Sequence, residues 1–429
     1  MMRRRWSFLA VPAAALGLLA AAGAPVSALP GPGGKQCLAA SPPSCYTLQQ
    51  FRTAYDIQPL LNRGIDGRGE TVSMIVYAAS PTASPPQVTD IRQDLATFDG
   101  LFHLPAAHIS VVTALAGASA PWEAGTEEVM DTEIVHAVAP GAALRVVLMP
   151  DSPQDTPAGD TAAMLAALPL AIRDTDVVSF SGALGEHFFS PAQVARMRGI
   201  LRDAADRHVT VVAASGDSGA VSDVYDFGTA PVKEVSLPAS DPFVLGVGGT
   251  ALTVGPQTGS YVGETAWNQV LQQGGNFASG GGFSGIFARP AYQDGVPGTE
   301  AARGVPDVSG DAGTGLALAI EAGGGSYELR SAGGTSAATP LWGGLVALAD
   351  QLAGHDLGFI NPVLYRIARS PLYSQAFHDV TRGDNTVAVN GVTYTGYPAG
   401  PGWDPVTGLG SPDAAVLIPL LGRAVGATG

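Results

Sequence analysis

Short apolar runs and helical stretches alternate along the first half of the chain, and this alternation restricts the fold more than any other feature. Runs typical of strands buried on both faces occur at 71–77, 144–149, 177–180 and 209–214. Helical stretches such as 162–173 lie between them. This order is typical of a parallel sheet with helices on both faces. Because 429 residues suit one large domain, we expect a single-domain α/β fold.

The charge balance limits the classes of partner. Only 14% of the residues are charged, and 22 basic against 37 acidic residues give a net charge of −15. Nucleic acid and anionic membrane surfaces are therefore poor partners. No segment after the N-terminus is apolar over a length that would span a membrane.

The N-terminus is typical of a secretory signal peptide. Arginines at 3–5 precede an apolar run at 8–22, and small residues at 26–28 suit a cleavage site. We therefore expect residues 1–28 to be removed and the protein to be secreted, with no membrane contact after cleavage. An uncleaved anchor is the alternative, but the run is short and rich in alanine and glycine.

A lead-in segment, residues 29–47, follows the signal and contains the only two cysteines, Cys37 and Cys45. In an oxidising compartment we expect them to pair and close a small loop. Two free thiols are the alternative, and neither lies in a catalytic context.

The sequence Gly-Gly-Thr-Ser-Ala-Ala-Thr-Pro at 333–340 places Ser336 before a helix-like run. A serine at a helix N-cap would have an exposed hydroxyl beside backbone N–H groups that lack intrahelical partners. Such N–H groups can hold an oxyanion, so one turn would supply a nucleophile and its charge stabiliser. Pro340 fits the first turn of a helix. An ordinary helix cap is the alternative.

A serine nucleophile needs a base, and none of the seven histidines lies in a suitable segment. The stretch 125–141 has a helical apolar pattern, and it carries Glu127 and Asp131 four residues apart on one face. Two carboxylates this close have separated pKa values and can share one proton, which makes a base that works below pH 7. A solvated acidic first turn is the alternative.

A third carboxylate, Asp217, follows directly after the strand at 209–214. Functional residues of α/β sheets gather beyond the carboxyl ends of strands. Asp217 is either a turn former or a protonated acid that donates a hydrogen bond to an oxyanion.

Along the chain, the three motifs are Glu-x-x-x-Asp at 127–131, Ser-Gly-Asp-Ser-Gly at 215–219 and Gly-Gly-Thr-Ser-x-Ala-x-Pro at 333–340. In this order they resemble those of the sedolisins, the serine-carboxyl peptidases with a subtilisin-like fold. Further similar segments occur at 236–250, 279–284, 289–293 and 305–309, and the similarity covers roughly residues 46 to 420. The resemblance implies a subtilisin-like peptidase domain at 48–425. It also implies that Ser336 is the nucleophile and Glu127 its general base. Asp131 would then orient Glu127, and Asp217 would stabilise the oxyanion.

Two Gly-rich segments near the C-terminus, 377–383 and 399–410, carry one further set of candidates. Carboxylates and backbone carbonyls are hard oxygen ligands that suit calcium, whereas Asp among Gly and Pro also forms ordinary turns. The resemblance implies one structural Ca²⁺, held by five residues: the side chains of Asp379 and Asp404 and the carbonyls of Val380, Gly400 and Gly402.

Two departures from the sedolisin pattern stand out. Most sedolisins carry a long N-terminal pro-region, whereas here the signal leads almost directly into the catalytic domain. We therefore expect the site to be uncovered once the chain folds, or a separate assistant to take part. The second departure is Ser-Gly-Ala at 181–183 where the family commonly has Ser-Trp-Gly, which alters the pocket and the tuning of the base.

From these features we expect a secreted, monomeric, acid-acting endopeptidase that hydrolyses polypeptides through an acyl-enzyme. The alternatives are a tripeptidyl-peptidase and a pseudo-peptidase that binds peptides without cleaving them. A conventional esterase or subtilase would need a histidine base that the sequence does not offer.

Overall fold

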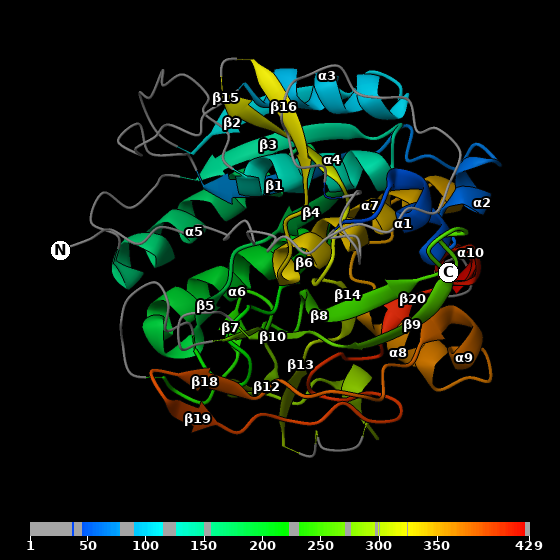
Figure 1. Cartoon of the computed structure of the whole chain (residues 1–429). Coiled ribbons are helices and arrows are strands. Elements are labelled where there is room, and N and C mark those ends of the chain that lie inside the picture. Colours follow the sequence, from blue (N-terminus) through cyan, green and yellow to red (C-terminus); the bar gives the residue numbers. More distant parts are fainter. Residues whose placement is uncertain are drawn as a thin grey trace.

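An eight-stranded sheet organises the molecule (Figure 1). Seven strands run parallel in the order β14-β8-β6-β4-β1-β3-β2, and β9 pairs with β8 in the antiparallel sense. The strands are β1 (Thr71–Tyr77), β2 (His108–Thr113), β3 (Ala143–Met149), β4 (Val177–Phe180), β6 (Thr210–Ala214), β8 (Leu245–Val254), β9 (Tyr261–Ala266) and β14 (Val308–Asp311). The computed structural model describes residues 37, 45–77, 90–114, 126–149, 156–222, 231–270, 276–296, 299, 301–323 and 325–424.

Helices cover both faces of this sheet. Alternate side chains of β1 face opposite cores: Met74 and Val76 pack into the core that α4 and α7 cover, and Ile75 packs into the core under α5 and α6. The α-helices are α1 (Leu48–Ala54), α2 (Gln58–Leu61), α3 (Ile91–Phe102), α4 (Thr126–Val138), α5 (Pro157–Ala171), α6 (Pro191–Asp206), α7 (Thr335–Ala353), α8 (Asn361–Ala368), α9 (Tyr373–Ala376) and α10 (Ala414–Ala424). The predicted α/β fold, a parallel sheet with helices on both faces, is confirmed.

Local sequence explains where several of these helices begin. Ser190 and Gln193 form a reciprocal capping box at the start of α6, and Pro191 occupies its first position. The Thr156 hydroxyl accepts from the N–H of Gly159 at the start of α5. The helical stretch expected at 162–173 is the second part of α5, which ends two residues earlier.

In the described part of the chain, short two-stranded ribbons and 3₁₀ turns surround the sheet. The ribbons are β5 (Leu184–Gly185) with β7 (Ser236–Leu237), β10 (Asn268–Val270) with β11 (Asn276–Ala278), β12 (Gly282–Ala288) with β13 (Ala302–Val305), β15 (Leu318–Gly323) with β16 (Ser326–Arg330), β17 (Phe377–His378) with β20 (Ser411–Pro412), and β18 (Val387–Val389) with β19 (Val392–Tyr394). The 3₁₀ turns are η2 (Glu186–Phe188) and η3 (Ala291–Gln293).

The disulfide expected in the lead-in segment is present. Cys37 and Cys45 are bonded, with their Cα atoms 5.4 Å apart. Directly after Cys45, Tyr46 is fixed to the body of the molecule, because its N–H donates to Gly315 O and its carbonyl accepts from Ala317 N, both at 2.8 Å. The predicted signal peptide lies outside the described residues. Among the described helices, none is long and apolar enough to cross a membrane.

Candidate active site

The three predicted catalytic motifs meet beside the carboxyl ends of β4 and β6. Helix α4 carries Glu127 and Asp131, and it packs against α7, which carries Ser336. Asp217 lies in the loop that follows β6, and Ser181 follows directly after β4. Parallel strands bring their carboxyl ends to one edge, so segments far apart in sequence converge there.

Ser336 is the second residue of α7, and the N-cap is Gly334. The expectation that Ser336 itself caps the helix with an exposed hydroxyl is wrong, because Ser336 is only 2% exposed. The helix begins earlier since Asp217 replaces the cap side chain: its Oδ1 accepts from both the N–H and the hydroxyl of Thr335, each at 2.8 Å. This arrangement requires glycine at 334, where φ is 89° and an added Cβ would lie 2.4 Å from Asp217 Oδ2.

Pro340 leaves the carbonyl of Ser336 without its usual helical partner. Proline has no N–H, so it cannot donate to the carbonyl four residues earlier. The hydroxyl of Ser181 lies 3.2 Å from this carbonyl. In the other direction, Ser336 Oγ donates to the backbone carbonyl of Ser181 at 3.3 Å. Pro340 is the sixth residue of α7 and lies inside the helix, so the expectation that it occupies the first turn is wrong. Its position there leaves Ser336 free to contact the end of β4 in both directions.

The carboxyl pair on α4 is buried. Asp131 is fully buried, and the two carboxyl oxygens of Glu127 are shielded from solvent with no hydrogen-bond partner among the described residues. Burial and then the charge of Asp131 raise the pKa of Glu127 well above its usual range, while the nearby Ser336 hydroxyl opposes the rise. The alternative of a solvated acidic turn is therefore contradicted, and the pair is suited to share a proton.

Ser181 links this pair to the serine. Its hydroxyl lies 2.8 Å from Asp131 Oδ1, in addition to its contact with the carbonyl of Ser336. Burial raises the pKa of Asp131 well above its usual range, and the Ser181 hydroxyl opposes that rise. The charge of Asp217 contributes to the raised pKa of Glu127. All four predicted catalytic residues thus belong to one interacting group.

Gly182 lies where the sedolisin pattern commonly has tryptophan. An added Cβ at this position would lie 2.6 Å from two ring atoms of Phe180. Any larger residue here would require that ring to move. The glycine at 182 therefore suits the local packing, because the ring of Phe180 in β4 occupies the space that a larger side chain would need.

The predicted calcium ligands are also brought together. Gly402 N–H donates to both carboxyl oxygens of Asp379, at 3.1 and 3.0 Å, and Gly400 N–H donates to Asp404 Oδ2 at 3.2 Å. The Thr407 hydroxyl bridges Asp404 Oδ2, at 2.9 Å, and the Val380 carbonyl, at 3.5 Å. Burial raises the pKa of Asp404 to about 6. This all-oxygen set of two carboxylates and nearby carbonyls fits Ca²⁺ in its chemistry.

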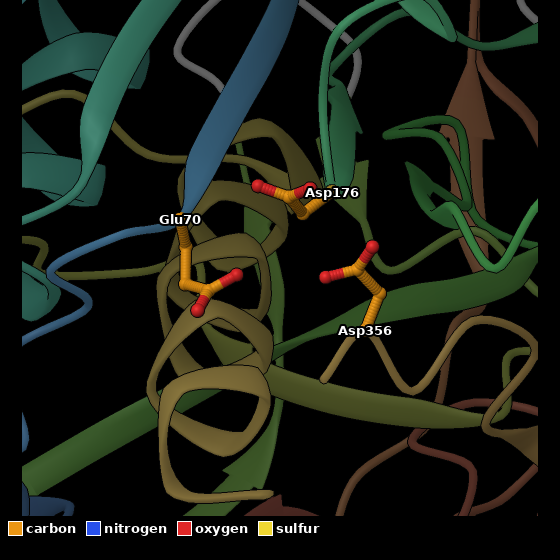
Figure 2. Close-up of side chains that lie close together, drawn as sticks. All are labelled: Glu70, Asp176 and Asp356. Atoms are coloured by element: carbon orange, nitrogen blue, oxygen red, sulfur yellow. The ribbon is translucent and has the colours of Figure 1, made fainter. Parts of the chain in front are cut away.

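Two features were not found from the sequence. One is the role of Ser181 in joining Asp131 to α7. The sequence does place Ser181 directly after a buried strand, where functional residues gather, and this position could have identified it. A group of carboxylates, Glu70, Asp176 and Asp356, also lies together (Figure 2). The sequence indicates this group less clearly. Glu70 and Asp176 each lie immediately before a strand, but only the structure shows that strands β1 and β4 are neighbours.

Comparison with known proteins agrees with the fold and the motifs. The model of the subtilase family matches residues 106–361, more than half of the chain. Kumamolisin from Bacillus sp. (strain MN-32) is 34% identical over 400 residues, which cover 88% of this chain and 64% of kumamolisin. Human tripeptidyl-peptidase 1 is 31% identical over 352 residues, which cover 76% of this chain and 57% of that protein. The chain thus spans less than two thirds of the length of these relatives.

A solved structure of Pseudomonas sedolisin, a serine-carboxyl proteinase in complex with pseudo-iodotyrostatin, has the same fold. The two superpose with a TM-score of 0.72 at 27% sequence identity, over 89% of this chain and 99% of the other. Sedolisin from Pseudomonas sp. (strain 101) is also 38% identical over 225 residues, which cover 51% of this chain and 36% of that protein.

Proposed function

We propose that this chain, which belongs to the subtilase family and within it to the sedolisins, is a serine-carboxyl peptidase that hydrolyses polypeptides through an acyl-enzyme on Ser336. One observation carries the proposal: a buried carboxyl pair on α4 adjoins a serine in the first turn of α7. A hydroxyl in this setting has a proton acceptor but no histidine. His136, on the same helix, is engaged elsewhere, with Asp99 at 2.9 Å.

The carboxyl pair acts as the base of the acylation step. Ser336 Oγ attacks the carbonyl carbon of the scissile peptide bond, and its proton passes to Glu127. Before the attack, Asp131 holds the single proton of the pair and Glu127 is ionised. In its protonated form, Asp217 donates to the oxyanion, together with the backbone N–H of Ser336 in the first turn of α7.

Collapse of the tetrahedral intermediate breaks the C–N bond, and Glu127 returns the proton to the leaving amine. Water then attacks the acyl-enzyme, with Glu127 again as base, and the released Ser336 hydroxyl regains its proton. Each proton that leaves a nucleophile is thus delivered to a leaving group. The pair returns to its singly protonated state.

The protonation states required by this scheme favour acidic pH. The pair is active when it carries one proton, and burial extends that state upward in pH because it disfavours double ionisation. Asp217 donates only while protonated, which acid also favours. We therefore propose a bell-shaped pH profile with its maximum below neutrality.

Two candidate modes of cleavage remain, endopeptidase and tripeptidyl-peptidase. The second is supported by the similarity to tripeptidyl-peptidase 1. A peptide with a blocked amino terminus distinguishes them, because only an endopeptidase cleaves it. We further propose one Ca²⁺ at the 379–404 loops, a monomer, and secretion, with which the Cys37–Cys45 disulfide is consistent.

The test is cleavage of denatured protein between pH 3 and pH 7. Ser336→Ala and Glu127→Gln should each reduce kcat/KM, by about 10⁴-fold for the serine, since the nucleophile has no substitute. Ser370→Ala, which removes a hydroxyl after α8, is the matched control and should retain activity. Comparable cleavage by the Ser336→Ala variant would overturn the assignment. A folded wild type inactive at every pH would favour the pseudo-peptidase.

A further inference from the structure

Three carboxylates from distant parts of the sequence converge at the edge of the sheet opposite the active site (Figure 2). Glu70 precedes β1, Asp176 precedes β4, and Asp356 lies in the loop after α7. One oxygen from each lies within 4.8 Å of the other two. Three carboxylate oxygens this close can ligate one divalent cation, and three carboxylates are a common ligand set for Ca²⁺.

A fourth carboxylate gives an independent indication of a ligand. Asp350, in the last turns of α7, is fully buried, and its Oδ2 has no hydrogen-bond partner among the described residues. Its Oδ1 accepts from the N–H of Leu357 at 2.9 Å, so the carboxyl group is turned toward the segment that carries Asp356. Burial and then the charges of Glu70, Asp356 and Asp176 raise the pKa of Asp350 to about 8.

The charges of this group are not balanced within the described part of the chain. None of the four carboxylates has an ion pair with a described basic side chain. Burial raises the pKa of Glu70 to about 7, and Asp176 and Asp356 add to the rise. Four acidic groups in partly buried surroundings repel one another once ionised, and a divalent cation removes that repulsion.

We propose that Glu70, Asp176 and Asp356, with Asp350 behind them, bind a divalent cation of the size of Ca²⁺. This site is separate from the 379–404 loops. The ion joins the start of β1, the start of β4 and the loop after α7. Because catalytic residues lie at the opposite ends of the strands, the ion stabilises the fold and does not take part in the chemistry.

The experiment measures bound calcium by equilibrium dialysis at pH 8, above the raised pKa of Glu70, which is about 7. The full chain carries Ser336→Ala so that self-cleavage does not interfere. Asp356→Asn should bind one calcium ion fewer than its parent. The exposed Asp206→Asn is the matched control and should bind the parent number. Asp404→Ala, in the other candidate site, should leave the ion at Asp356 in place.

Thermal melting distinguishes two explanations for the carboxylate group, namely that it binds a cation or that it stabilises the fold without one. Asp356→Asn should melt above its parent in chelator, because one repelling charge is removed, and should lose about 3 °C of the rise that excess calcium chloride produces. Equal calcium binding by the Asp356→Asn and Asp206→Asn proteins would overturn the proposal. It would indicate that the carboxylates share protons with one another instead of binding a cation. Glu70→Gln repeats the test if Asp356→Asn does not fold. Peptidase activity is not used, so the result is independent of the proposed function.

Discussion

Ser181 connects the acidic pair on α4 to the first turn of α7. Its hydroxyl contacts Asp131 Oδ1 at 2.8 Å and the Ser336 carbonyl at 3.2 Å, and that carbonyl is available because Pro340 has no N–H. We regard Ser181 as a positioning residue, since its side chain contacts Asp131 and the backbone of Ser336, the proposed nucleophile. The sequence motif identifies the serine and the pair, but not this link between them.

Ser181→Ala should shift the acid limb of the kcat/KM profile to higher pH by about one unit. The hydroxyl lowers the pKa of Asp131, so its loss raises the pKa of the pair, and a hydrogen bond to a charged group contributes about 1.5 kcal/mol or more. The measurement is kcat/KM against pH for the variant, the wild type and the Ser370→Ala control. An unchanged profile with uniformly lower activity would indicate a general packing role instead.

At the scale of elements, the two Gly-rich segments 377–383 and 399–410 depend on each other. The N–H of Gly402 donates to Asp379, and the hydroxyl of Thr407 lies 3.5 Å from the carbonyl of Val380, so both contacts connect one segment to the other. Within the second segment, the N–H of Gly400 donates to Asp404. A bound cation would hold the two carboxylates together more strongly, because it neutralises their charges.

Calcium at these loops should raise the melting temperature, and Asp404→Ala should remove that part of the rise. An ion that binds only the folded chain at a hundredfold excess over Kd stabilises it by about 2.7 kcal/mol. The measurement is a thermal melt with and without chelator. Asp384→Ala, an exposed aspartate between the two segments, should respond as the wild type does. Identical calcium responses of the Asp404→Ala and Asp384→Ala proteins would exclude the loop site.

At the scale of the whole molecule, several buried carboxyl groups have raised pKa values that burial causes. They include Asp241 and Asp404 at about 6, Glu70 and Glu264 at about 7, and Asp350 at about 8. A carboxyl with a higher pKa in the folded state binds its proton more tightly when folded. Its stabilising contribution is fully present below the unfolded pKa, near 4, and is lost as pH rises through the folded value.

The ion-free protein should therefore melt at a higher temperature at pH 5 than at pH 8. Glu264 alone, raised from 4.5 to about 7, should contribute on the order of 3 kcal/mol to the difference between strongly acidic and alkaline pH. The measurement is a series of melts in chelator with the Ser336→Ala protein. A melting temperature that is constant or rises toward pH 8 would contradict these pKa directions.

The sequence by itself determined the fold class, several of the central strands and the candidate residues of the site. Strands β1 and β4 begin and end where their apolar runs predict, because a buried strand must be apolar throughout. The candidate catalytic residues were predicted from short motifs and from the family resemblance that these motifs carry, and both can be read without the fold. The cysteine pair was also predicted, since only two cysteines exist and they lie close in sequence.

Only the tertiary structure decided how these residues are buried and which of them meet. Asp217 caps α7 in place of Ser336, and Ser181 joins Asp131, through contacts between residues 50 or more positions apart. Glu70, Asp176 and Asp356 likewise meet because parallel strands align their amino ends, which no local pattern records. Burial sets the pKa values of these carboxyl groups, and burial is a property of packing among distant segments rather than of neighbours in the chain.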